Sequence, residues 1–150
     1  MKGPPSGLPY EWLPGVPHRA VVYGVTLSEV FEHAAEAMFA LTVDIAAIPP
    51  TYSRPIVAPG DTVVELLVNW LEELRYVGHR EGIVWSWFVV DRVEEGGVQG
   101  SASGMPSGDA PHRSEIVTSV EVVSEGVVDV PEGLWVELEF AVGPPIVDLT

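Results

Sequence analysis

Residues 23–39, Tyr-Gly-Val-Thr-Leu-Ser-Glu-Val-Phe-Glu-His-Ala-Ala-Glu-Ala-Met-Phe, decide the fold of this chain. They contain a capping box, because the Thr26 hydroxyl and the Glu29 carboxylate can each satisfy a free backbone N–H at a helix start. Apolar residues then recur at helical spacing, at Leu27, Val30, Phe31, Ala34, Met38 and Leu41. Polar residues fall between them and are expected to face water: Glu29, Glu32, His33 and Glu36. The pattern predicts a helix that ends near Asp44.

A second helix is predicted after Pro59-Gly60, with Asp61 or Thr62 as its N-cap and Gly78 as its C-terminal stop. Its apolar residues again follow helical spacing, at Val63, Leu67, Trp70, Leu71 and Leu74. A valine-rich stretch, residues 16–23, predicts a strand before the first helix. A short extended stretch, residues 54–58, precedes the second helix.

The second half of the chain predicts strands. Residues 83–93 are dense in β-branched and aromatic side chains, and we expect Trp85, Trp87 and Val89 to share one face. Gly96-Gly97 indicates a hairpin turn into a strand at 98–103, and residues 104–111 read as a loop. Two more strands are expected at 114–123 and 134–142, around a turn region at 126–133. In the last strand, apolar residues alternate with Glu137 and Glu139, which is typical of a half-buried strand.

The order strand, helix, strand, helix and then several strands predicts an α+β fold, with two helices packed on largely antiparallel β-sheets. The length of 150 residues suits a single domain over 1–150. Within it we expect a flexible N-terminal segment at 1–9 and a C-terminal tail at 143–150.

The composition limits the setting in which the chain works. No run reaches the roughly 18 apolar residues that a membrane span needs. The Pro- and Gly-rich residues 1–15 lack the apolar centre of a signal peptide. The chain contains no cysteine, which removes disulfides, thiolate metal sites and a cysteine nucleophile. A cytoplasmic location is the expectation.

Charge constrains the partner. Seven basic residues face 22 acidic ones, for a formal net charge of −15. Such a surface repels a phosphate backbone, so direct nucleic-acid binding is not expected. A basic protein partner or a divalent cation suits an acidic field, which steers both inward. The alternative interpretation is that the acidity serves solubility alone.

Several short sequence motifs, taken in their order along the chain, resemble those of the archease family over nearly the whole chain. Tyr10-Glu11-Trp12-Leu13 looks like the family's opening Tyr-Glu-Tyr-Leu, and residues 23–39 match its first helix. Gly60-Asp61, residues 70–74 and Glu81-Gly82 resemble the second helix and the turn beyond it. The resemblance implies an accessory protein, not a catalyst, that helps the GTP-dependent RNA ligase of tRNA splicing (the RtcB class) to become guanylylated. It also implies acidic residues gathered around a divalent cation such as calcium.

The tracts that would hold this cation depart from the family pattern. The family has an Asp-His-Thr-Ala-Asp tract where this chain has residues 14–21, so Pro17 or Val21 replaces the second aspartate. Asp44 matches the family's aspartate at the end of the first helix. Val142 stands near the expected final aspartate, and Asp148 lies beyond it in the tail. The resemblance thus leaves Asp44 and Asp148 as metal ligands, with His18 as a possible neighbour.

Purely structural roles are the alternative for these residues. Asp44 can be a turn aspartate that bonds nearby backbone amides, and His18 can be a hydrogen-bonded strand residue. His112 falls in a loop that could contact a partner, whereas His33 and His79 read as solvated residues.

No nucleophile–base set and no phosphate-binding loop stands out. A hydrolase or isomerase would need a cleft lined by His18, Asp44 and a third titratable side chain. Two hypotheses remain: an accessory protein of an RNA ligase, or an archease-like scaffold that has lost the cation and serves another protein partner.

Overall fold

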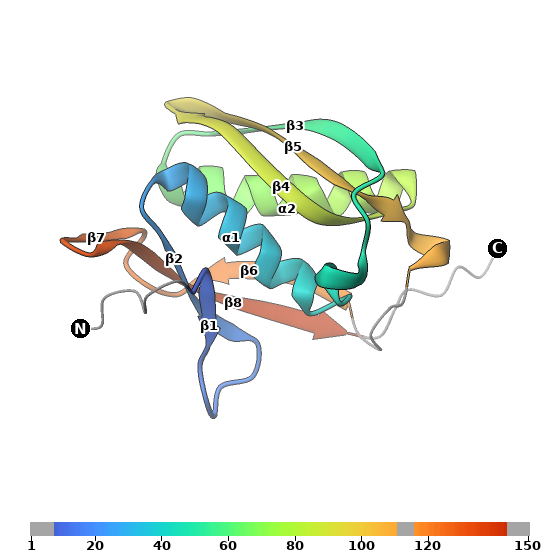
Figure 1. Cartoon of the computed structure of the whole chain (residues 1–150). Coiled ribbons are helices and arrows are strands. Elements are labelled where there is room, and N and C mark those ends of the chain that lie inside the picture. The colour runs from blue at the N-terminus through green and yellow to red at the C-terminus, as the bar shows by residue number, and fades with distance from the viewer. Residues whose placement is uncertain (1–7, 111–115, 144–150) are drawn as a thin grey trace.

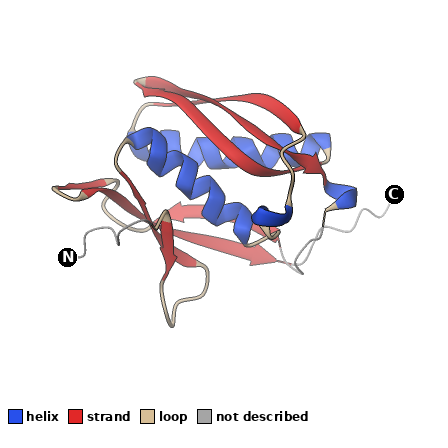
Figure 2. Cartoon of the chain, in the orientation of Figure 1, coloured by secondary structure: helices blue, strands red, loops and turns tan. Residues whose placement is uncertain are grey.

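The computed structural model describes residues 8–110 and 116–143. Two helices, α1 (Leu27–Ala40) and α2 (Val63–Glu81), form a middle layer between two antiparallel sheets (Figures 1 and 2). The predicted α+β class, with two helices against antiparallel sheets, is confirmed. Within the described residues, no helix combines the length and the apolar composition that a membrane crossing requires.

The strands divide between the two sheets. The five-stranded sheet has the order β1-β2-β8-β6, and β7 also pairs with β8; its strands are β1 (Tyr10–Trp12), β2 (Arg19–Gly24), β6 (Ile116–Val122), β7 (Val128–Val130) and β8 (Gly133–Gly143). The three-stranded sheet has β5 at its centre, in the order β3-β5-β4; its strands are β3 (Tyr52–Gly60), β4 (Ile83–Glu94) and β5 (Gly96–Pro106). Gly143 therefore belongs to β8 and pairs with Ile116.

One continuous core joins the three layers. It includes Phe31 and Trp70 from the helices, Leu138 and Phe140 from the five-stranded sheet, and Phe88 from the three-stranded sheet. Helix α1 joins β2 of the five-stranded sheet to β3 of the three-stranded sheet, and α2 joins β3 to β4. Both helices are covered by a sheet on two sides. This explains why α1 buries seven of its residues: Val30, Phe31, Ala34, Ala35, Ala37, Met38 and Phe39.

Both predicted helix starts are confirmed. Thr26 Oγ1 accepts from the Glu29 N–H at 3.2 Å, and the Glu29 carboxylate accepts from the Val25 N–H at 2.9 Å. Thr62 is the N-cap of α2, where its hydroxyl accepts from the Glu65 N–H at 3.1 Å. Two reciprocal hydrogen bonds of this kind satisfy free donors of the first turn, which fixes where a helix begins.

Both predicted helix ends are wrong. Helix α1 stops at Ala40, because the N–H groups of Thr42 and Val43 both turn back to the Phe39 carbonyl. Helix α2 continues through Gly78 to Glu81, and Gly82 caps it in the left-handed conformation at φ 69°. Gly78 is needed instead for packing, since a Cβ there would lie 2.8 Å from the Ile83 carbonyl oxygen.

The expectation that Trp85, Trp87 and Val89 share one face is also wrong. Strand β4 is irregular between Trp85 and Trp87, so that Ser86 is an extra residue in the ladder. Such a bulge shifts the alternation of side chains by one position. Trp85 is fully buried and donates from Nε1 to the Leu74 carbonyl at 2.9 Å, whereas Trp87 and Val89 point outward.

Polar side chains on α1 are less solvated than expected. The Glu32 carboxylate accepts from the Val90 N–H at 2.8 Å, and His33 Nδ1 lies 2.6 Å from the Tyr23 carbonyl oxygen. Glu36 is half-buried. The prediction that these residues simply face water is wrong, because α1 lies between two sheets and has only a narrow exposed side.

Burial of Glu36 makes a prediction about pH. Desolvation raises the pKa of its carboxyl above the usual 4.5; His33 opposes this rise and Glu32 adds to it. A raised pKa in the folded state means that the stability contributed by this group is complete below about 4.5 and is lost as the pH rises through the folded-state pKa. Glu36→Gln should therefore raise the melting temperature at about pH 7 and leave it unchanged at about pH 4. Glu94→Gln, at an exposed position, is the control, and an equal gain at both pH values would contradict the prediction.

Candidate functional site

Asp44 lies in an exposed turn after α1. It is the N-cap of the short 3-10 helix η1 (Ile45–Ala47), and its Oδ1 accepts from the Ala46 N–H at 3.2 Å. The side chain therefore serves a local turn in this structure. The other proposed ligand, Asp148, lies outside the described residues, as does His112.

His18 lies in the loop between β1 and β2, with a left-handed φ of 61°. Its carbonyl accepts from the Phe140 N–H at 2.8 Å, so the backbone is tied to β8 just before β2 begins at Arg19. The predicted strand start at residue 16 is therefore too early, because this conformation at His18 interrupts an extended chain.

A hollow of about 490 Å³ adjoins His18. Apart from His18, its walls are apolar or glycine: Trp12, Leu13, Gly15, Val16, Pro17 and Leu41. Asp44 does not line this hollow. A hydrolase was expected to need a cleft lined by His18, Asp44 and a third titratable group. The described residues do not form such a cleft beside His18.

The donor set here does not fit a calcium cage. Calcium takes six to eight oxygen ligands, several of them carboxylates. Within 8–110 and 116–143, no three His, Asp or Glu side chains gather where they could hold a metal ion. Asp44 is already engaged with a backbone amide, and Pro17 and Val21 offer no side-chain oxygen.

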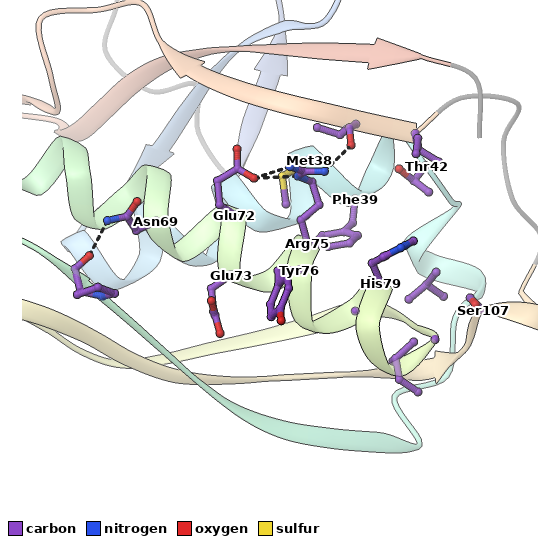
Figure 3. Close-up of a pocket in the computed structure, with 17 residues that line it drawn as sticks. Met38, Phe39, Thr42, Asn69, Glu72, Glu73, Arg75, Tyr76, His79 and Ser107 are labelled. Atoms are coloured by element: carbon purple, nitrogen blue, oxygen red, sulfur yellow. Dashed lines mark hydrogen bonds and ion pairs between the residues drawn. The ribbon is translucent and has the colours of Figure 1, made fainter. Parts of the chain in front are cut away.

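A larger groove, of about 950 Å³, follows the outer side of α2 (Figure 3). Its apolar wall includes Met38 and Phe39 from α1 and Val117 from β6. Its polar rim comes from α2: Asn69, Glu72, Glu73, Arg75, Tyr76 and His79. No local pattern in the sequence indicates this groove, because it forms where α2, the end of α1 and β6 meet, and these segments are far apart in the chain.

One ion pair crosses the rim of this groove. Arg75 Nη2 lies 2.6 Å from Glu72 Oε1, and Arg75 Nη1 donates to the Val117 carbonyl at 3.3 Å (Figure 3). Arg75 thereby links α2 to the edge of the five-stranded sheet and neutralises Glu72. The groove can accommodate an apolar segment, but Glu72 is already committed to Arg75 and is a poor candidate for acid–base work.

The outward face of the five-stranded sheet is acidic. Arg19 contacts Glu139 and lies 3.5 Å from Glu137, and the Glu139 bond raises the pKa of the Arg19 guanidinium. Glu121 stands directly opposite Glu139 on β6. One arginine thus faces three glutamates, which leaves this face negatively charged.

A buried phenol lies on the same side of this sheet. The Tyr23 hydroxyl donates to the Glu11 carboxylate at 3.2 Å. Burial, reinforced by Glu11, raises the pKa of Tyr23 to about 12. The phenol therefore stays protonated at neutral pH and ties β1 to β2.

Comparison with known proteins shows what this architecture is. The archease protein family (MTH1598/TM1083) matches residues 18–123. Protein archease of Methanosarcina acetivorans is 32% identical over 124 residues, which cover 81% of this chain and 85% of that protein. The chain belongs to the archease family. Protein archease of Methanopyrus kandleri is 35% identical over 120 residues, which cover 77% of this chain and 84% of the relative.

The archease fold is matched in a solved structure as well. The solution structure of Methanobacterium thermoautotrophicum protein 1598 superposes with a TM-score of 0.69 at 23% identity. The match covers 89% of this chain and 99% of that one. It supports the layered fold of an archease, with both helices between the two sheets.

Proposed function

We propose that this archease is an accessory protein of an RNA ligase in tRNA splicing or RNA repair, and that it acts through protein–protein contact. Membership of the archease family, matched over residues 18–123, carries the proposal. Its role is to help the ligase become guanylylated, while the bond-forming chemistry stays with the ligase.

The charge of the chain supports a protein partner of this kind. A ligase that holds RNA must present basic residues to the phosphate backbone. A chain with a net charge of −15 is attracted to such a surface over a long range. The acidic sheet face with Glu121, Glu137 and Glu139 contributes to this attraction.

The second hypothesis is an archease-fold scaffold that has lost the cation and serves another protein partner. One observation favours it: the tract around His18 forms an apolar hollow where the family resemblance would place carboxylates. The two hypotheses differ in the partner and in the cation. The second requires that the cation is lost, whereas the first also allows a weak cation site at Asp44.

The test is to purify the chain together with the RNA ligase of its host and to measure the rate of ligase–guanylylate formation. We expect a several-fold faster rate at equimolar chain, and the same rate with and without added calcium. An unrelated acidic protein of similar size and net charge is the control for non-specific electrostatic effects. No stimulation, whether calcium is present or absent, would exclude the ligase role. Stimulation that requires calcium would exclude action without a calcium site.

A further inference from the structure

The outward face of the three-stranded sheet is uncovered by the described chain. Both helices pack on its other side (Figure 1). Outward positions follow from the register: Ser53, Pro55 and Val57 on β3 pair with Ser103, Ser101 and Gln99 on β5, and Ser103 and Ser101 also pair with Trp87 and Val89 on β4. We call these eight residues the Trp87 face.

The Trp87 face combines four apolar residues with four small or uncharged polar ones: Pro55, Val57, Trp87 and Val89 with Ser53, Gln99, Ser101 and Ser103. Trp87 is 62% exposed and Val57 is 59% exposed, on opposite outer strands. Ser103 on β5 pairs with Trp87 on one side and with Ser53 on the other, and it is only 9% exposed, although no helix covers it. It bonds to Ser53, with 2.7 Å between the two hydroxyl oxygens. Trp87 and Val89 therefore form a raised apolar edge on β4 beside the low serines of β5.

The position of Trp87 is built by the strand itself. The bulge at Ser86 turns Trp87 outward while Trp85 and Phe88 stay in the core. An indole has only two side-chain torsions, so a partner that covers it loses little conformational entropy. Tryptophan in such a setting is the residue type most enriched among those that dominate binding energy.

Charge decides which occupant fits. The eight positions of the Trp87 face carry no carboxylate, in a chain with 22 acidic residues. Exposed carboxylates stand beside it at the hairpin end of β4: Asp91, Glu94 and Glu95. Arg92 lies among them, opposite Gln99 and 3.8 Å from Glu94, so this border keeps an excess of negative charge after that ion pair. Exposed apolar side chains with an acidic border complement an apolar pocket bordered by lysine or arginine.

A second copy of the chain fits poorly. Strand spacing and rise give the Trp87 face roughly 15 by 20 Å, or about 300 Å². A stable interface buries about 800 Å² on each partner, so the contact must extend over the border. In a symmetric dimer two chains of net charge −15 would then repel each other across this contact.

We propose that the Trp87 face is the docking surface for the RNA ligase, and that it seats Trp87 in an apolar pocket bordered by basic residues of that partner. This rests on the proposed function and adds the surface through which contact is made. The acidic border attracts the partner, and the buried indole holds it.

The experiment measures the Kd of the full chain for its host's ligase by calorimetry, for the wild type, Trp87→Ala and Tyr76→Ala. Tyr76 is 57% exposed on α2 and lines the groove, so its variant is a matched exposed-aromatic control at the rival surface. We expect Trp87→Ala to raise the Kd at least about tenfold with an unchanged melting temperature. Tyr76→Ala should bind like the wild type. A second variant, Val57→Lys, places a cation against the basic border and should also weaken binding.

The outcomes separate this proposal from the one on which it rests. Wild-type binding by Trp87→Ala, or loss of binding by Tyr76→Ala alone, would overturn the docking surface while leaving the ligase role intact. No binding by the wild type would overturn both. Sedimentation of the chain alone as a dimer that Trp87→Ala dissociates would overturn the proposal in favour of a second copy.

Discussion

Trp70→Ala is expected to lower the free energy of unfolding by about 3–5 kcal/mol, the range for removing a large aromatic side chain from a core. Trp70 is fully buried on α2, and its Nε1 donates to the Phe31 carbonyl of α1 at 3.1 Å. The ring also reaches the three-stranded sheet, because a Cβ at Gly100 would lie 3.1 Å from its Cη2 atom. One indole thus joins both helices and a sheet.

Chemical denaturation monitored by circular dichroism measures the Trp70 effect. A domain of this size is stabilised by only about 5–15 kcal/mol, so the loss is a large fraction of the total. The exposed Trp87→Ala is the matched control and should change stability by no more than about 0.5 kcal/mol. Equal losses for the two tryptophans would show that the layered core is wrong.

Gly104→Ala is expected to cost about 3 kcal/mol, at the upper end for overpacking a core. A Cβ at Gly104 would lie 1.7 Å from the Val84 carbonyl oxygen and 2.9 Å from the Trp85 Cα. Both are backbone atoms of the neighbouring strand β4, so relief requires the sheet itself to open. A side-chain rotation cannot provide it.

Thermal unfolding is measured for two purified variants, Gly104→Ala and Gly108→Ala, and for the wild type. A Cβ at Gly108 meets nothing within 4 Å, which makes it a control for the general glycine-to-alanine effect. We expect Gly108→Ala to stay within about 0.5 kcal/mol of the wild type. A Gly104→Ala protein as stable as Gly108→Ala would mean that β4 and β5 are not paired as described.

Local signals predicted the helices well. The capping boxes at Thr26 and Thr62 involve residues three apart, so the sequence alone contains the whole interaction. Helix ends were less accessible. Gly78 and Gly82 both suit a C-terminal stop, and only the close approach of Ile83 and Trp85 shows why Gly78 lies inside the helix.

The sequence patterns did not predict which strands pair with one another. The division into two sheets depends on contacts such as β2 with β8, which join residues more than 100 positions apart. The bulge at Ser86 follows from pairing with β5 and has no signature in the residues around it. It places Trp85 and Trp87 on opposite faces of the sheet, so that only Trp85 is buried. Glu32 likewise looks solvated in the sequence until α1 is placed beside β4.

The sequence named candidate site residues but did not predict the surfaces that the fold creates. The family resemblance proposed Asp44, Asp148 and His18 as the remnant of a cation site. The structure shows Asp44 in a local turn and His18 beside an apolar hollow, and Asp148 lies outside the described residues. The groove along α2 and the Trp87 face both depend on long-range packing, which a sequence pattern of period 2 or 3.6 does not encode.

Our central proposal is that this archease keeps the two-helix body of its family and lacks a calcium cage. Calorimetric titration of the full chain with calcium, followed by a melting curve at millimolar calcium, tests it most directly. We predict no binding heat and no change in melting temperature. A stoichiometric heat, together with a rise of about 5 °C or more as expected when a ligand at 100 times its Kd stabilises a domain of this size, would contradict the claim.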